Sequence, residues 1–309
     1  MFYAYSMAEK VSYRSTGVSR PHRPIAWVAS IPYFTVHLVA LVSLFYVDYS
    51  WKLFLICMAS YFLRMFGITA GYHRYFAHRS YKLNRFWQFW MAVLAQSAMQ
   101  RGVLWWAGYH REHHKHSDQE DDLHSPKQDG FWWSHLGWFL AKDQDKTDFS
   151  LTQDFAKFPE LIFLEKYYYL PAVFYAVTLY LLGGVQVLMW GFFISSVLTW
   201  QATSTINSLS HIFGSQRYKT TDTSRNNFLL AILTLGEGWH NNHHTYMTSA
   251  NQGFYWWEWD PTYYILKALS WVGITKDLRR APLDTLEAKR IDRSAQLQDS
   301  PITQTFNNA

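Results

Sequence analysis

The sequence predicts an all-α membrane protein. Four transmembrane helices form two hairpins, and a cytosolic helical cap holds a histidine-rich site for two metal ions. Three observations support this prediction. Of the 309 residues, 49% are hydrophobic and 19% are aromatic. The apolar residues gather in long runs with few charges, as in proteins that cross a bilayer. Three histidine clusters lie between these runs rather than inside them.

Four apolar segments approach the length of about 20 residues that a helix needs to cross a hydrocarbon core. They are residues 25–47, 52–71, 167–184 and 186–207. The short connections 48–51 and 183–185 indicate that the segments pair as two hairpins. Arg64 in the second segment, and the polar end of the fourth, indicate that these two helices face protein or a cavity.

The N-terminal segment, residues 1–24, carries four cations and one acid before the first apolar run: Lys10, Arg14, Arg20 and Arg23 against Glu9. Such a basic flank is typical of the cytosolic side of a membrane. With four crossings, the second and fourth segments then return to the cytosol just before His73 and His211. All three histidine clusters are therefore expected on the cytosolic face.

Two further apolar stretches, 86–106 and 252–274, are interrupted by polar residues. We interpret both as amphipathic helices at the membrane surface. An alternative for 86–106 is a fifth crossing, which would place the first and second histidine clusters on opposite sides. Residues 25–280 are expected to form one domain, and 281–309 a polar, partly disordered C-terminal tail.

The histidine clusters have the spacing of metal ligands. His110, His113 and His114 form an HxxHH pattern, which recurs in the trio listed next: His240, His243 and His244. Residues i, i+3 and i+4 share one face of a helix, so each trio is expected to point at a common place. His73 and His78 are five apart, which requires either a helix end or ligation of two different ions.

With His211, these clusters supply nine imidazoles, more than one ion can bind, so two ions are expected. Ligands that are mostly nitrogen suit iron that handles oxygen better than magnesium or calcium, although the spacing does not distinguish iron from zinc. The other histidines show no repeated spacing and are assigned no metal: His22, His37, His116, His124 and His135. Of these, His124 and His135 are candidates for structural contacts to the ligands.

Other site classes find little support. Cys57 is the single cysteine, so a cysteine-based metal site within the chain is excluded. We interpret Cys57 as a small buried hydrophobic residue. The net charge of +5 is modest, and no basic block indicates nucleic-acid binding. A non-catalytic metal transporter is an alternative. Transporters, however, place ionisable ligands midway along their spans, whereas these histidines lie at span ends.

Five motifs together resemble a known family: "GYHRYFAH", "HREHHKHSDQEDDLHSP", "GFWWSHLGW", "NSLSH" and "GEGWHNNHH". Over residues 25–280, the chain is similar to the membrane fatty acyl desaturases of the stearoyl-CoA (delta-9) type, in a bacterial-like form. This resemblance implies an oxidoreductase that inserts a cis double bond, at delta-9, into a saturated acyl chain. It implies two iron ions, dioxygen as co-substrate, and electrons from an external carrier such as ferredoxin or cytochrome b5. No flavin, nicotinamide or fused cytochrome motif is found in the sequence.

The resemblance also assigns residues. It implies these iron ligands: His73, His78, His110, His113, His114, His211, His240, His243 and His244, with Asn207 acting through a bound water. It implies a substrate tunnel with Tyr61 and Met65 at its closed end, Gln100 and Trp106 near its bend, and Thr203 and Ser204 near the metals.

The chain departs from animal members of this family at two places. Ser204 stands where they have a tryptophan, which leaves the shape of the tunnel near the metals open. Gly108 and Tyr109 stand where they have Arg-Asp, so the acyl carrier stays open between CoA, acyl-carrier protein and membrane lipid. Hydroxylation, or conversion of an alkene to an alkyne by an acetylenase, is an alternative outcome at the same centre.

Overall fold

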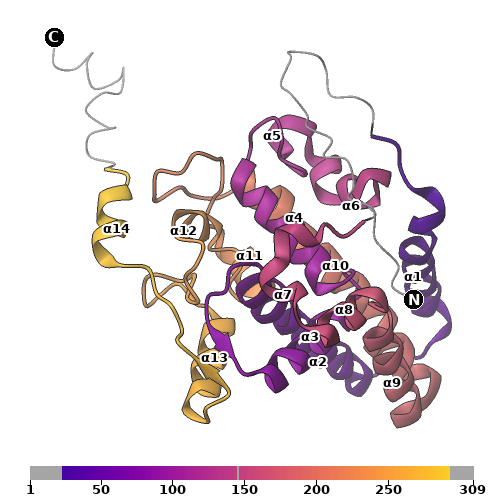
Figure 1. The fold of residues 1–309 in the computed structure, drawn as a ribbon. Coiled ribbons are helices and arrows are strands. Elements are labelled where there is room, and N and C mark those ends of the chain that lie inside the picture. The colour runs from indigo at the N-terminus through magenta and orange to yellow at the C-terminus, as the bar shows by residue number, and fades with distance from the viewer. Residues whose placement is uncertain (1–22, 145, 293–309) are drawn as a thin grey trace, which may run out of the picture.

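The computed structural model describes residues 23–144 and 146–292, and most of its regular structure is helical (Figure 1). Lys10, Arg14, Arg20 and His22, and residues 293–309 of the predicted tail, lie outside the described residues. Three helical segments are long and apolar enough to cross a membrane: Trp27–Tyr46, Trp51–Ala77 and Leu170–His211. The architecture agrees with the predicted all-α membrane class.

The second segment is longer than predicted. Helix α2 (Trp51–Phe66) continues without interruption into a π-helix, η1 (Gly67–Ala77), whereas the apolar run ends at residue 71. Every residue of η1 is buried in the protein. Polar side chains can therefore extend this helix beyond the apolar run, because protein groups rather than lipid surround them. The extension carries His73 into the interior of the fold.

The third segment folds back on itself. It contains α9 (Leu170–Leu188), the π-helix η5 (Met189–Ile194), α10 (Ser195–Ser208) and the 3-10 turn η6 (Leu209–His211). The backbone leaves the helical conformation at Gly183 and at Gly184, where φ is 65° and favours glycine. One side-chain carbon of Leu179 lies 3.2 Å from the position that a Cβ on Gly191 would take, and another lies 3.4 Å from it. In a straight helix, residues twelve apart would be about 18 Å apart.

The two connections lie at one end of the molecule. The Gln186 side chain, just after the glycine break, donates to Asp48, which follows α1 (Trp27–Tyr46), over 3.4 Å. At the opposite end of α1, the Ala26 N–H donates to the Leu140 carbonyl over 2.8 Å. The ends of the spans that adjoin the histidine clusters are therefore opposite to the two connections.

Arg64 links α2 to the last segment in the membrane region. Its guanidinium is fully buried and donates to the hydroxyls of Ser195 and Ser196 and to the Phe192 carbonyl. The guanidinium also lies over the Tyr175 ring, 5.4 Å from its centroid. Arg64 thus faces protein, as its place in an apolar segment predicts.

The predicted surface helix 86–106 is divided in the structure. It consists of α3 (Arg85–Gln96) and the start of α4 (Val103–His116), separated by a bend with positive φ at Met99 and Arg101. The Glu165 carboxylate accepts the N–H groups of Leu104 and Trp105, over 2.8 and 3.2 Å, and so stabilises the new helix start. With 12 and 14 residues, each helix is shorter than a hydrocarbon core of about 30 Å.

The predicted surface helix 252–274 is also shorter than expected. Only α13 (Pro261–Trp271) is helical. It begins after Asp260, whose side chain accepts the Tyr263 N–H over 3.0 Å. The preceding residues form a loop because Gln252, Glu258 and Asp260 are buried in polar contacts with the rest of the fold.

The predicted tail begins with a helix, α14 (Leu283–Lys289). Its end is attached to the body of the protein, since the Lys219 N–H donates to the Lys289 carbonyl over 2.8 Å. The remaining short elements are α5 (Pro126–Asp129), η2 (Trp133–Gly137), α6 (Trp138–Leu140), η3 (Lys142–Gln144), η4 (Phe149–Thr152), α7 (Gln153–Ala156), α8 (Pro159–Lys166), α11 (Phe228–Leu233), α12 (His240–Thr245), and the two-residue antiparallel strands β1 (Lys82–Leu83) and β2 (Thr275–Lys276).

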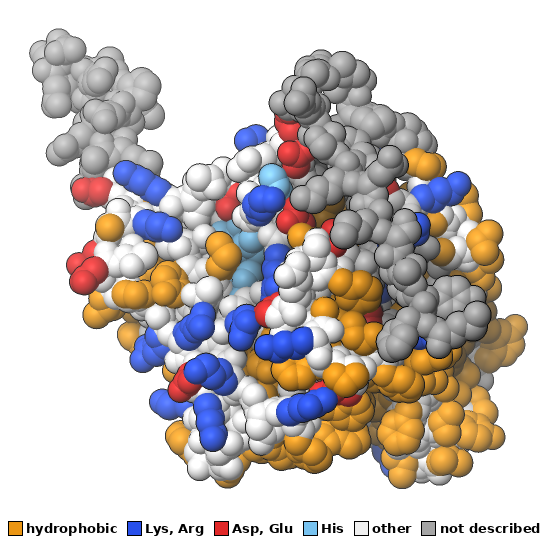
Figure 2. All heavy atoms as spheres, in the orientation of Figure 1, with side chains coloured by type: hydrophobic (Ala, Val, Ile, Leu, Met, Phe, Trp, Pro, Cys, Tyr) orange, Lys and Arg blue, Asp and Glu red, His pale blue; other side chains and the backbone are white. Residues whose placement is uncertain are grey.

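The largest apolar core lies beneath the histidine clusters. Buried residues of η1, α3, α4, α7, α8 and α13 pack together there. In Figure 2, hydrophobic side chains also cover the outer surface at the lower right, where α9 lies in Figure 1. An internal core therefore supports the histidine-bearing helices, while the spans expose an apolar outer surface.

We expect the double substitution Ser195→Ala, Ser196→Ala to lower the free energy of unfolding by about 2–4 kcal/mol, because it leaves buried N–H groups of Arg64 unsatisfied. Thermal unfolding in detergent measures this loss. The matched control is Thr178→Ala, which removes a hydroxyl that donates only within its own helix. Equal losses in the two proteins would contradict a specific role for the Arg64 contacts.

Candidate metal centre

Nine histidine side chains converge from four parts of the chain into two adjacent groups. They come from η1 and the residue after it, from α4, from η6 and from α12. The five-histidine group is His73, His78, His110, His114 and His243. The four-histidine group is His113, His211, His240 and His244. Within each group, the nitrogen atoms all lie within 4.8 Å of one another.

The spacing within the five-histidine group is that of ligands around one ion. The Nε2 atoms of His73 and His243 are 3.0 Å apart, and those of His243 and His114 are 2.9 Å apart. His110 Nε2 lies 3.0 Å from His114 Nε2 and 2.9 Å from His78 Nε2. Two nitrogen ligands at a right angle, each about 2.1 Å from an ion, are about 3.0 Å apart.

The π-helix explains how His73 and His78 share one group despite being five residues apart. The His78 N–H donates to the His73 carbonyl over 3.1 Å, which is an i to i−5 hydrogen bond. In this register, residues five apart approach the same side of the helix, as those four apart do in an α-helix. The two histidines thus lie in one group rather than in two, and the π-helical register, which was not among the predicted alternatives, brings them together at the end of η1.

Each HxxHH trio serves both groups, which corrects the expectation of one common place per trio. On α4, His110 and His114 point to the five-histidine group, whereas His113 points to the other. On α12, His240 and His244 share the four-histidine group, and His243 joins the five-histidine group. The i, i+4 pair stays together on each helix, and the i+3 residue lies far enough around the helix to reach the neighbouring group.

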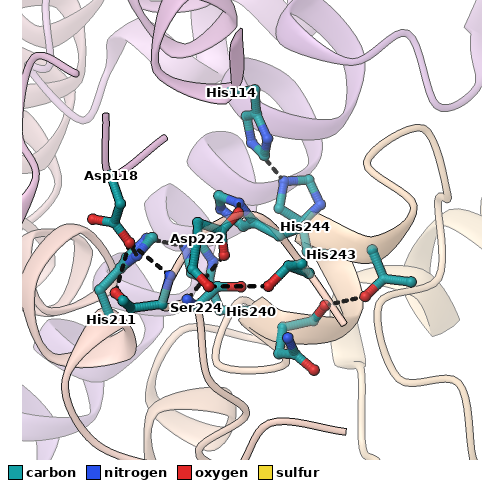
Figure 3. A network of polar contacts seen from close by, with 12 residues as sticks. His114, Asp118, His211, Asp222, Ser224, His240, His243 and His244 are labelled. Carbon is teal, nitrogen blue, oxygen red and sulfur yellow. Dashed lines mark hydrogen bonds and ion pairs between the residues drawn. The ribbon is translucent and has the colours of Figure 1, made fainter. Parts of the chain in front are cut away.

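Carboxylates stand behind four of the imidazoles, two of which are visible in Figure 3 as Asp118 beside His211 and Asp222 beside His244. The Nδ1 atoms lie 3.2 and 2.8 Å from these carboxylates. The other two pairs are His73 with Glu237 at 2.5 Å and His113 with Asp122 at 2.8 Å. A carboxylate that accepts the Nδ1 hydrogen leaves Nε2 with a free lone pair, the form that binds a metal.

Electrostatics favour the neutral, ligand form of three histidines in the five-histidine group. Burial, together with the neighbouring imidazoles, lowers the pKa of His110, His114 and His243 well below the ordinary histidine value, so they are neutral at neutral pH. Burial opposes ionisation of Asp118 and Asp222, but the hydrogen bonds and charges of His211 and His244 lower the pKa of these carboxyls. His113 differs: burial lowers its pKa, but the charge and hydrogen bond of Asp122 outweigh burial and raise it.

A buried chain of charges extends outward from His73. Glu237 contacts both His73 and Arg74, whose guanidinium lies 3.1 Å from the carboxylate. Arg74 also donates to both oxygens of Asp260 over 2.9 Å, and Asp260 begins α13. Arg74 thereby connects a histidine of the five-histidine group to the surface helix.

These acidic partners were not identified from the sequence. Asp118 and Asp122 follow the second histidine cluster directly, and Glu237 precedes the third by three residues, so proximity could have indicated them. Asp222 lies in a loop without any recognisable pattern. It reaches His244 only through the tertiary fold.

The remaining histidines lie outside the two groups. The His124 ring stacks on His113 with 4.1 Å between centroids, and the backbone N–H of His124 donates to Asp122 over 3.2 Å. His135 bonds to Ser208 and Gln201 on α10, over 2.9 and 3.0 Å. His124 therefore makes the structural contact to a predicted ligand that the sequence indicated, whereas His135 secures the last span.

A cavity of ≈870 Å³ adjoins the five-histidine group at His110. Its lining includes four of the six predicted tunnel residues and Asn207: Gln100, Trp106, Thr203, Ser204 and Asn207. Gln100 donates to the Thr203 hydroxyl over 3.1 Å and accepts the Trp106 indole N–H over 3.3 Å. These contacts join the bend before α4 to α10 beside the histidines.

Tyr61 and Met65 lie outside this lining. They are buried in a separate cluster with Leu235, and the Tyr61 hydroxyl donates to the Leu233 carbonyl over 2.6 Å. Their place at the closed end of a tunnel therefore stays a prediction.

The residues present fit a pair of transition-metal ions. The Nε2 atom of His244 is buried and has no hydrogen-bond partner, although it faces three other imidazoles of its group. Lone pairs that face one another at hydrogen-bond distance repel, and a cation between them removes this repulsion. Imidazole donors suit iron, zinc, copper or nickel.

Comparison with known proteins identifies similar chains. The family model described as fatty acid desaturase matches residues 49–270. The chain is 37% identical over 266 residues to an sn-1 stearoyl-lipid 9-desaturase of Synechocystis sp. This alignment covers 85% of this chain and 83% of the relative. It is 34% identical to an sn-2 palmitoyl-lipid 9-desaturase of Nostoc sp., with 84% and 92% covered. It is 36% identical to an acyl-CoA C20 Delta5-desaturase of Anemone leveillei, with 75% of each chain covered.

We expect Asp222→Ala to weaken metal binding at the four-histidine group by about 10–100-fold, because His244 loses the carboxylate that orients its ring. Competition with a chelator, followed by metal analysis of the protein, measures the affinity. The matched control, Asp277→Ala, removes an exposed acid that pairs with Lys82 at the surface. Equal metal retention in the two variants would exclude this role of Asp222.

Proposed function

Because the chain belongs to the fatty acid desaturase family and is thus an oxidoreductase that acts on fatty acyl chains, we propose that it inserts a cis double bond at the delta-9 position of a saturated chain. The observation that carries this proposal is the convergence of nine histidines into two groups beside a cavity of ≈870 Å³. The names of the Synechocystis and Nostoc relatives support the delta-9 position.

Two iron ions are proposed as the metals, one in each group, with Asn207 acting through a water at the cavity side. Bound there, the iron pair would supply the activation of dioxygen that removes two hydrogens from the acyl chain. The carboxylates Asp118, Asp122, Asp222 and Glu237 keep hydrogens on Nδ1 and so aim Nε2 at the ions.

The proposed position of the double bond depends on geometry, because neighbouring methylene groups are chemically alike. The Gln100, Trp106 and Thr203 contacts give the cavity wall a fixed shape next to His110. Ser204, which stands in place of the tryptophan of animal relatives, lines the same wall. A chain held against this wall presents one methylene pair to the metals.

The proposed topology has four crossings, with the histidine groups on the cytosolic face. The glycine break divides Leu170–His211 into two arms, so that this segment and the first two helices together supply four spans. Lys/Arg residues before the first span support the cytosolic assignment. The domain bounds 25–280 follow from these spans and the histidine-bearing cap.

Reduction of dioxygen to water takes two more electrons than the acyl chain provides. An external carrier, by proposal ferredoxin or cytochrome b5, must supply them. The acyl carrier is proposed to be a membrane lipid, as the names of two matched relatives support. CoA and acyl-carrier protein are the alternatives that the assay below distinguishes.

We expect cells that express the protein to form a new cis double bond at carbon 9 of saturated chains, located by mass spectrometry in each lipid and thioester fraction. His114→Ala should abolish the product. His116→Ala, which changes a histidine outside both groups on the same helix, should retain it. A hydroxylated or acetylenic chain as the sole product, or an unchanged acyl profile, would reject the proposal.

We further expect Met65→Ala to accept acyl chains longer by about two carbons, since it removes side-chain volume at the predicted closed end of the tunnel. The measurement is the length distribution of unsaturated products. Met91→Ala, a buried methionine in the core beneath the histidines, is the matched control. Unchanged product lengths in Met65→Ala would assign Met65 to packing alone.

A further inference from the structure

The cavity beside His110 extends to the outer surface of two candidate spans. On α1, its lining includes Val28, Ala29 and Pro32, and on α9 it includes Val173 and Val177. These residues are exposed, with 82% of Val28 and about half of each α9 valine accessible. The outer end of the cavity is therefore an apolar rim between α1 and α9, which lie on the same side of the molecule in Figure 1.

The inner end of the same cavity reaches the candidate metal centre. Phe192 and Phe193 of η5 line its middle, and Thr203 and Ser204 of α10 continue the lining toward His110. Both α1 and α9 pack on η5, which therefore lies beneath the gap between them. A single space thus connects the outer surface of the spans to one of the histidines.

The two sides of the gap are held in place. On α1, Tyr33 and His37 are contacted by the side chain of Gln201 on α10, over 3.3 and 3.1 Å. On α9, Ala172 and Leu179 are buried against Phe192. These contacts attach both sides of the gap to η5 and α10.

The rim lies beside aromatic residues that are typical of the membrane surface. Tyr168 and Tyr169 precede α9 and line the cavity, and Trp27 begins α1 next to Val28. Exposed tyrosine and tryptophan side chains at the ends of spans are typical of headgroup depth. The opening therefore faces the bilayer just below the headgroups, on the side of the histidine groups.

We propose that this gap, defined by Val28, Ala29, Pro32, Val173 and Val177, is a lateral portal through which an acyl chain of a bilayer glycerolipid enters the cavity. The inference rests on the proposed function. A chain that passes sideways between α1 and α9 stays in apolar surroundings, because both the bilayer and the rim are apolar. The five rim residues carry no charge, whereas Arg101 lines the cavity farther from the rim.

The test narrows the portal with bulky side chains. The rim variants are Val28→Trp and Val177→Trp. The controls are Leu41→Trp and Leu181→Trp, which enlarge exposed residues on the same two helices away from the cavity. Each protein is purified with its iron and placed in phosphatidylcholine vesicles that contain distearoyl glycerolipid, and dioxygen and reduced ferredoxin or cytochrome b5 are supplied in excess. We expect the rim variants to lose about tenfold or more of the desaturation rate, with iron content unchanged and controls within about twofold.

A second measurement locates the lipid without relying on turnover. A glycerolipid with a diazirine on its acyl chain is irradiated in the same vesicles, and the adducts are mapped by mass spectrometry. We expect adducts on the rim valines and on Phe192 or Phe193. Adducts confined to other surfaces, as expected if a second chain covers the rim, would overturn the proposal.

The outcomes separate the portal from the proposed function. Rim variants that desaturate glycerolipid at the wild-type rate overturn the portal, even if lipid adducts form there, because the bound lipid is then only structural. A wild-type protein that holds iron but forms no double bond on any acyl carrier overturns the proposed function. Loss of activity in the rim variants with retained iron and rim adducts supports the portal.

Discussion

The close approach of imidazole nitrogens that carry lone pairs is the constraint on which the rest of the structure depends. In the five-histidine group, Nε2 atoms lie 2.9–3.0 Å apart, although a neutral imidazole whose Nδ1 bears the hydrogen has no hydrogen to share there. Such an arrangement is favourable only around cations, so the surrounding protein must hold the rings in place before and after metal binding. In this group Glu237 holds His73, and Arg74 in turn holds Glu237 in a fully buried network. In the four-histidine group, Asp122, Asp118 and Asp222 hold His113, His211 and His244.

Because the centre lies at the ends of the spans, it can combine charged groups with an apolar cavity for the acyl chain. Ionised carboxylates from the segments next to α4 and α12 contact the histidines, and the hydrocarbon region would not tolerate such charges. The cavity beside them is lined mainly by apolar and aromatic side chains. A fatty acyl chain can therefore stay in apolar surroundings along its length while one pair of its carbons lies next to the polar centre. Helix η1 makes this possible because it continues a span into the cap with every residue buried. His73 therefore lies in the polar cap although its helix begins in the apolar region.

The sequence predicted the histidine groups better than the helix bounds and the acidic partners, for physical reasons. The nine histidines were identified because metal ligands are chemically distinctive and recur at helical spacing. The surface helices 86–106 and 252–274 were predicted too long, because apolar composition does not reveal a helix start that a distant Glu165 stabilises, or a loop that buries Asp260. Asp222 was missed altogether, since nothing in its loop marks it as the partner of His244. Four of six predicted tunnel residues line the cavity, whereas Tyr61 and Met65 pack elsewhere in the membrane region.

The amino-acid sequence alone determined which segments are apolar enough for a bilayer, which side chains can bind metal, and that one ion could not use them all. These properties belong to residues and their near neighbours, so periodicity and composition report them. Only the tertiary structure decided how each HxxHH trio divides between two groups, how a π-helical register unites His73 with His78, and where the gap between α1 and α9 opens. Each of these depends on the relative placement of helices distant in the chain, which local patterns do not encode.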